Sequence, residues 1–185
     1  MKELIEIYNS QSQSALTSET MAEVPKLAAA FEAAWHNGRT VYFCGNGGSA
    51  VNANHLANDF LNGVGTSRCV GLRVESLSAN SAALTCLAND IGYGELYSVQ
   101  LRVKANANDV LVVFSGSGNS LNVIRALEVA NSMGMETFAV LGYSGGKCKA
   151  IAKHSIHFEI NDMQVAEDLQ LVVFRMVMQY LVSKS

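Results

Sequence analysis

Two side chains capable of acid–base and metal chemistry, His55 and Asp59, stand four residues apart. Residues at that spacing share one face of a helix, so both side chains can reach the same ligand. An imidazole and a carboxylate can bind a divalent metal, or they can serve as an acid and a base. The alternative is a surface histidine beside a solvated acidic neighbour.

Two glycine- and serine-rich segments, 44–49 (CGNGGS) and 115–120 (SGSGNS), each follow an apolar run and precede a helical pattern. A helix N-terminus offers unpaired N–H groups and a partial positive charge, which favour an anion. Glycine lets the backbone approach such a ligand closely. The alternative for either segment is an ordinary strand-to-helix turn with a serine cap. Finding two of them at equivalent places makes a binding site the better interpretation.

The second segment also limits which anion fits. It contains no lysine, so it is not a nucleotide-binding Walker A loop, and it lacks the glycine spacing of a dinucleotide fingerprint. A serine-dense loop without lysine is suited to a single phosphate monoester. We therefore predict a sugar phosphate as the ligand.

The elements that must position these loops alternate between apolar runs and helical patterns after residue 38. Buried apolar runs predict a doubly wound α/β fold with a parallel sheet of about five strands, flanked by helices. The predicted strands are 41–44, 69–74, 109–114, 137–141 and 154–160, and the predicted helices are 49–61, 79–88, 94–105, 121–133, 146–152 and 163–182. We expect Asp162 to cap the last helix, and His154 and His157 to be structural.

The chain is expected to form one domain, 1–185, in which a pair of N-terminal helices (1–37) supports oligomerisation and 38–185 form the binding core. It is 49% hydrophobic and 16% charged, with a mean hydropathy of +0.17, which favours burial between subunits. A net charge of −3 and scattered basic residues argue against nucleic acid as a partner. Four cysteines without CxxC spacing, and no apolar run long enough to span a membrane, predict a cytoplasmic protein without a membrane partner.

The two motifs CGNGGS and SGSGNS, with the helix that bears His55, resemble the sugar isomerase (SIS) domain. Within it they are most similar to the phosphoheptose isomerases, and the resemblance covers nearly the whole chain. It implies a homotetramer, a phosphate held by the serine loop, and often a zinc ion. The implied reaction interconverts sedoheptulose 7-phosphate and D-glycero-D-manno-heptose 7-phosphate, which feeds heptose into a surface polysaccharide.

The same resemblance assigns the substrate-binding positions. Gly116 stands where these enzymes carry a threonine, so one donor is missing. The positions implied to bind substrate are Asn46, Gly47, Gly48, Asn89, Asp90, Ser115, Gly116, Ser117 and Ser120.

Isomerisation through an enediol needs a base for the carbon proton and an acid or a metal at the carbonyl oxygen. The resemblance implies that His55, Asp59 and Glu167 are the catalytic residues and the metal ligands, with Asp59 in place of a longer glutamate. Arg175 replaces the family histidine, and a guanidinium is neither a base nor a metal ligand. Arg175 is therefore expected to pair with Asp59, Glu167 or a substrate oxygen, and zinc to be weakly bound or absent.

The sequence is compatible with two functions. In the first, Glu167 or Asp59 is the carbon base of an isomerase, and His55 or a metal polarises the carbonyl. In the second, the chain is a non-catalytic tetramer that binds a sugar phosphate or a protein, similar to the DnaA initiator-associating protein. The presence of His55, Asp59 and Glu167 favours the enzyme.

Overall fold

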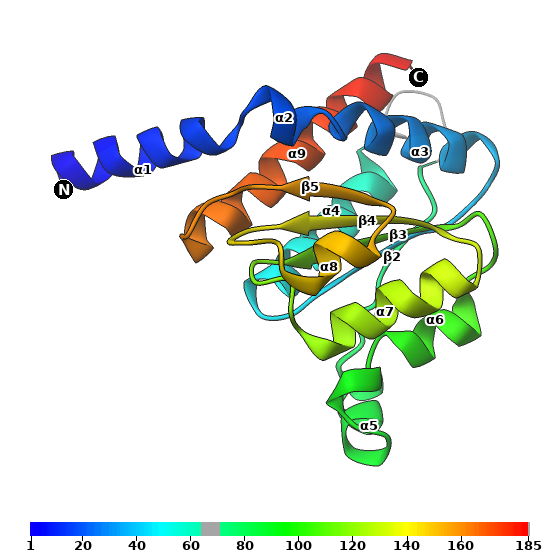
Figure 1. Cartoon of the computed structure of the whole chain (residues 1–185). Coiled ribbons are helices and arrows are strands. Elements are labelled where there is room, and N and C mark those ends of the chain that lie inside the picture. Colours follow the sequence, from blue (N-terminus) through cyan, green and yellow to red (C-terminus); the bar gives the residue numbers. More distant parts are fainter. Residues whose placement is uncertain (64–70, 185) are drawn as a thin grey trace.

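A computed structural model describes residues 1–63 and 71–184 and shows a five-stranded parallel sheet between two layers of helices (Figure 1). The strand order is β2-β1-β3-β4-β5, which is a doubly wound arrangement, as the sequence predicts. The strands are β1 (Val41–Gly45), β2 (Val74–Ser76), β3 (Val110–Ser115), β4 (Glu136–Leu141) and β5 (His154–His157). The chain order reverses between β1 and β3, so a ligand crevice is expected beyond their carboxyl ends.

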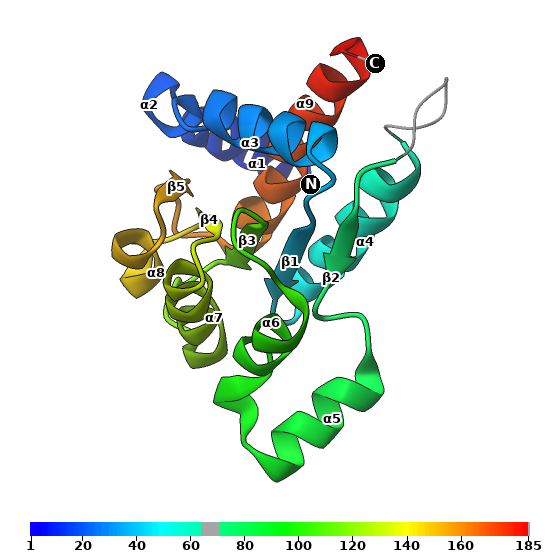
Figure 2. The same ribbon diagram turned by 90° about the vertical axis from the view of Figure 1, so that its right-hand side faces the viewer.

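Alternating side chains of the central strands pack into two separate hydrophobic cores, one on each face of the sheet. On β1, Phe43 packs into one core, whereas Tyr42 and Cys44 pack into the other. The first core joins the sheet to α3 (Val24–His36), α4 (Gly48–Asn62) and α9 (Met163–Lys184). The second joins it to α6 (Ser98–Lys104), α7 (Leu121–Ser132) and α8 (Gly146–Ile151). Figure 2 shows these two layers on opposite sides of the sheet.

The first core is held by an aromatic group that links helices distant in sequence. Phe174 of α9 packs with ring centroids 5.2 Å from Phe114 and 5.9 Å from Phe31. All three side chains are fully buried. Close aromatic pairs of this kind contribute beyond their buried area. This packing fixes α9 against the sheet and therefore fixes the side chains that α9 presents to the ligand crevice.

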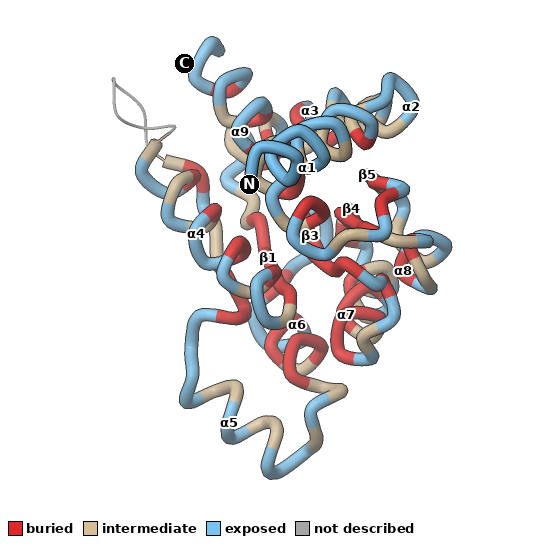
Figure 3. Tube along the Cα trace, turned by 90° about the vertical axis from the view of Figure 1, so that its left-hand side faces the viewer, coloured by how far each residue is buried: buried red, intermediate tan, exposed pale blue. Residues whose placement is uncertain are grey.

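The N-terminal region contains three helices where a pair was predicted: α1 (Lys2–Ala15), α2 (Ser18–Met21) and α3. Thr17 caps the short α2, because its side chain accepts from the Thr20 N–H. Figure 3 shows α1 as largely exposed, and Ala15 is its only fully buried residue. By contrast, α3 contributes four buried residues to the first core, whereas α1 contributes one, Ala15, and α2 only the partly buried Met21.

Several predicted boundaries were wrong. The strand predicted at 69–74 is β2 at Val74–Ser76, and residues 69 and 70 lie outside the described part. The helix predicted at 94–105 is divided into the 3₁₀ helix η1 (Tyr93–Glu95) and α6, and the helix predicted at 79–88 is α5 (Ser81–Asp90). β5 ends three residues before its predicted end. Short or divided elements carry too few residues for periodicity to fix their ends. Among the described residues, no helix is long and apolar enough to cross a bilayer.

Candidate sugar-phosphate site

The two predicted loops meet beyond the carboxyl ends of β1 and β3, at the point where the strand order reverses. A cavity of about 400 Å³ opens between them, and Glu167 of α9 closes its other side. Doubly wound proteins bind their ligands at this position. The cavity is lined by Asn46, Gly47, Gly48, Ser49, Phe114, Ser115, Gly116, Ser117, Ser120, Met163 and Glu167.

The serine loop is shaped by its own hydroxyls and by one glycine. The Ser115 hydroxyl accepts from the Gly118 N–H at 3.0 Å, and the Ser117 hydroxyl accepts from the Asn119 N–H at 3.3 Å. Gly118 has a φ of 65°, and a Cβ there would collide with the Gly145 carbonyl, so only glycine fits. Ser120 immediately precedes α7, and its side chain makes no capping bond. The loop therefore presents hydroxyls and a helix N-terminus to the cavity, a combination suited to phosphate.

Gly116 is explained by a side chain from α9. A Cβ at Gly116 would collide with the Met163 sulfur, which occupies the space beside the loop. A threonine at this position, as the resemblance implies for related enzymes, would require Met163 to move. The space that a side chain at residue 116 would need is therefore filled by the Met163 thioether.

The first loop is held against Glu167 in the same way. Gly48 begins α4, and a Cβ at this residue would collide with the Glu167 carboxylate. The absence of a side chain at Gly48 lets the carboxylate lie directly over the loop. Gly47 has a φ of 56°, which also favours glycine.

A buried polar network fixes the position of Glu167. Gln170, which is 1% exposed, donates from Nε2 to the Ser49 hydroxyl at 3.3 Å, and Ser49 donates to Glu167 Oε1 at 3.4 Å. Asn52 donates to Gln170 Oε1 at 2.9 Å and to the Glu167 carbonyl at 3.0 Å. Each buried polar group of this network has a partner, which is the condition for such a network to add rigidity. The hydrogen bonds end on the Glu167 carboxylate, which lines the cavity.

Asn46 is anchored by two other elements. Its amide exchanges hydrogen bonds with the buried Asn122 side chain at 2.9 and 2.8 Å, and Tyr93 donates to its Oδ1 at 3.0 Å. Tyr97 donates to the Gly45 carbonyl, and burial raises the pKa of the Tyr97 phenol. Asn46, Tyr93 and Tyr97 also line an adjoining cavity of about 280 Å³, which enlarges the space available beyond the serine loop.

His55 and Asp59 share a face of α4, as predicted, and Arg175 of α9 lies across both. Arg175 Nη1 is 2.6 Å from Asp59 Oδ2, and Arg175 Nη2 is 2.8 Å from His55 Nε2. The guanidinium cannot accept, so Nη2 is the donor in this contact, and His55 Nε2 also lies 3.2 Å from Asp59 Oδ2. Asp59 Oδ2 is buried without a well-aligned hydrogen bond in the described chain, which makes its Arg175 contact an ion pair. None of these three residues lines the 400 Å³ cavity.

Asn89 and Asp90 stand apart from the loops in the described chain. They lie at the exposed end of α5, where the Asn89 amide donates to Asp90 Oδ1 at 2.7 Å. Neither lines the two cavities beside the first loop. Figure 1 shows α5 projecting away from the sheet, and none of its residues is fully buried. Their assignment as substrate-binding residues remains a prediction.

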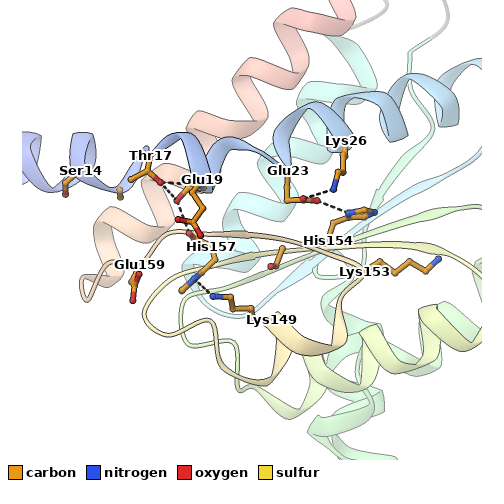
Figure 4. Close-up of a pocket in the computed structure, with 13 residues that line it drawn as sticks. Ser14, Thr17, Glu19, Glu23, Lys26, Lys149, Lys153, His154, His157 and Glu159 are labelled. Carbon is orange, nitrogen blue, oxygen red and sulfur yellow. Dashed lines mark hydrogen bonds and ion pairs between the residues drawn. The ribbon is translucent and has the colours of Figure 1, made fainter.

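A cavity of about 590 Å³ lies elsewhere, between the N-terminal helices and β5 (Figure 4). His154 has one ring nitrogen 2.8 Å from Glu23 and the other 2.9 Å from Glu136, and its ring stacks on Phe138. His157 lies between Lys149 and the Tyr143 carbonyl. Both histidines thus tie neighbouring elements together. This cavity is larger than the loop cavity, but no predicted site residue lines it, so we assign the chemistry to the loops.

Comparison with known proteins agrees with this geometry. The SIS domain family model matches residues 8–142. The phosphoheptose isomerase of Helicobacter pylori (strain P12) is 36% identical over 137 residues, which are 74% of this chain and 71% of that protein. This chain belongs to the phosphoheptose isomerase family of SIS-domain proteins.

Solved structures of the family extend the likeness to α9, which lies beyond the matched residues. The phosphoheptose isomerase GmhA from Neisseria gonorrhoeae superposes with a TM-score of 0.86 at 27% identity, over 98% of both chains. A phosphoheptose isomerase from Francisella tularensis gives a TM-score of 0.89 at 24% identity, over 99% of this chain and 98% of that one, and shows the shared fold.

The donor set does not fit the zinc site that the family resemblance implies. His55 and Asp59 face a guanidinium, whereas Glu167 faces Ser49 at the cavity. Across residues 1–63 and 71–184, no three His, Cys, Asp or Glu side chains gather closely enough to hold a metal ion. The three predicted ligands are therefore divided between two places on the α4–α9 pair, and no chemical step is assigned to a metal.

Sequence reasoning missed several residues that shape the site. Asn122, Tyr93 and Tyr97 hold the first loop, and Ser49 and Met163 line the cavity. Ser49 was within the quoted motif and could have been singled out. Met163 gave no local signal, because its role depends on the proximity of Gly116. In contrast, Asp162 caps α9 as predicted, since its Oδ1 accepts from the Val165 N–H at 3.1 Å.

Proposed function

We propose that the protein is an aldose–ketose isomerase that interconverts sedoheptulose 7-phosphate and D-glycero-D-manno-heptose 7-phosphate. The observation that carries the proposal is the presence of the Glu167 carboxylate and the serine loop in one cavity, in a member of this family. The loop supplies a site for the phosphate, and the carboxylate supplies a base within reach of the sugar.

In the proposed mechanism, the phosphate is held by the Ser117 and Ser120 hydroxyls and the N-terminus of α7. Glu167 takes the proton from the carbon beside the carbonyl, and the carbonyl oxygen takes a proton from solvent, which gives an enediol. Glu167 then returns its proton to the neighbouring carbon, while the other oxygen releases a proton to solvent. Atoms and electrons balance without any co-reactant. Ser49 keeps the carboxylate oriented during both transfers.

The direct test is a coupled assay of the purified chain with sedoheptulose 7-phosphate. We expect turnover by the wild-type protein and a loss of about 100-fold or more in kcat for Glu167→Gln, because the amide cannot accept the carbon proton. Glu128→Gln, on the exposed side of α7, is the matched control and should retain activity. Absence of turnover with heptulose and pentulose phosphates, with or without added zinc, would refute the isomerase proposal.

The second candidate function is non-catalytic binding, and the contact of Arg175 with His55 favours it, because His55 is then unavailable as an acid. In that case the serine loop would bind the sugar phosphate without turnover. Calorimetric binding of sedoheptulose 7-phosphate together with a silent assay would establish this alternative.

We also propose a homotetramer in the cytoplasm, supplying heptose for a surface polysaccharide. Exposed apolar residues on α1 (Leu4, Ile5 and Ile7) support the assembly, as does the lack of buried residues in α5. The described cysteines (Cys44, Cys86 and Cys148) are free thiols, which suits a reducing compartment. Light scattering of the purified chain tests the tetramer.

A further inference from the structure

The contacts of Arg175 occupy the atoms that a metal ion would need. His55 Nε2 accepts a hydrogen bond from the guanidinium at 2.8 Å, which uses the lone pair available for a metal. Asp59 Oδ2 lies 2.6 Å from Nη1 and 3.2 Å from His55 Nε2. A lone pair and a carboxylate oxygen therefore face the same cation, as two ligands would face one metal ion.

The positive charge of Arg175 also opposes the binding of a metal ion at His55 and Asp59. A guanidinium stays protonated at all physiological pH values, so the positive charge at the α4–α9 surface is permanent. A divalent ion approaching Asp59 would be repelled by that charge and would have to displace it. The Asp59 side chain is only 16% exposed, so a displaced guanidinium would leave its counter-charge in a poorly solvated place.

We propose that Arg175 is the resident cation of this site, in the place of a metal ion, and that the chain takes up no zinc at His55 and Asp59. For activity, the inference rests on the proposed isomerase function: a fixed protein cation predicts an isomerase that does not depend on an exchangeable metal. The metal-binding part of the inference stands without that function.

The test is a zinc titration of the full chain after exhaustive dialysis against a chelator. The wild-type chain should show no zinc site that depends on His55. Arg175→His removes the repelling charge and adds an imidazole facing the same two side chains, so zinc should bind at least about tenfold more tightly. Arg175→Met, which keeps the apolar stem without the charge, should also bind zinc more tightly than the wild type. Circular dichroism checks that each variant is folded.

Adding His55→Ala to either variant should abolish the gained zinc binding, which locates it on α4. Stoichiometric zinc in the wild-type chain that His55→Ala removes would overturn the proposal. So would a lack of tighter binding in both folded Arg175 variants.

The activity measurement separates the two proposals. Chelator-treated wild-type protein should keep its full turnover of sedoheptulose 7-phosphate, and loss of turnover that zinc restores would contradict a resident guanidinium. A wild-type chain that is inactive under all conditions contradicts the isomerase function, while the zinc titration still decides the role of Arg175.

Discussion

The α4–α9 helix pair carries two polar regions that differ in burial and in the sign of the charge they present. At its first turns, Glu167 faces the loop cavity and is held by the buried Ser49 and Gln170. Two turns further along α9, Arg175 pairs with Asp59, and its side chain is 48% exposed. The buried region fixes one carboxylate by neutral hydrogen bonds, whereas the exposed region satisfies a carboxylate with a charge.

This contrast shows which region can be altered at low cost. A buried network loses stability when one member is removed, because the remaining groups stay unpaired. In the Arg175–Asp59 pair, water can reach the half-exposed guanidinium, but the 16% exposed Asp59 carboxylate is poorly solvated without it. We therefore expect a substitution in the first region to cost more stability than the removal of Arg175.

The largest effect is expected from Gly48→Ala. The added Cβ would collide with the Glu167 carboxylate and push it from the cavity, so kcat should fall about 100-fold while the fold is retained. Val51→Ala, an exposed position on the same helix, should leave kcat unchanged. Steady-state kinetics measures kcat for both variants, and circular dichroism checks that both remain folded. Normal turnover by Gly48→Ala would show that Glu167 is not held where the structure has it.

Gln170→Leu should come next. It removes the donor to Ser49 and leaves Asn52 without its Gln170 acceptor, so we expect a loss of about 1–3 kcal/mol in the free energy of unfolding. Urea unfolding measures this loss. Gln179→Leu, which lies on α9 beyond the network, is the control and should cost less. Equal losses in the two variants would mean that the network adds nothing specific.

A smaller, pH-dependent effect is expected from Tyr97, which holds the first loop. Burial raises its pKa above the unfolded value of 10.0, so the folded state keeps the phenol protonated where the unfolded state ionises. Stability is thus fully present below pH 10 and falls above it, with a limiting slope of about 1.4 kcal/mol per pH unit for one proton. Thermal unfolding between pH 8 and 11 should show this fall. Tyr97→Phe should flatten it, and an unchanged slope would assign the titration to another group.

The smallest effect on stability is expected from Arg175→Met. Removing the half-exposed guanidinium leaves the 16% exposed Asp59 carboxylate without its counter-charge, so the free energy of unfolding should fall by about 1 kcal/mol. The affinity of inorganic phosphate for the serine loop should stay unchanged, since Arg175 does not line that cavity. Calorimetry with phosphate checks this. A clear loss of phosphate affinity would show that Arg175 influences the loop cavity, which contradicts the separation of the two regions in the structure.

The sequence alone determined the strand–helix alternation, the two loops and the cap at Asp162. These features depend on periodicity and on residue types within a few positions of each other, so they can be recognised from the sequence alone. The sequence also placed His55 and Asp59 on one helix face, because four residues make about one turn. It misplaced β2, whose three residues are too short for a pattern.

Tertiary structure decided how the distant elements meet. Packing of Phe174 against Phe114 of β3 and Phe60 of α4 places α9 beside α4. This position sets Glu167 over Gly48 and Arg175 across His55 and Asp59. The sequence placed Arg175 among several partners, and only the packing of the two helices chose between them. The same packing separated Glu167 from the other two predicted metal ligands. Contacts between residues more than a hundred positions apart follow from how the hydrophobic faces of whole helices pack. Local sequence patterns do not predict which helices pack against each other.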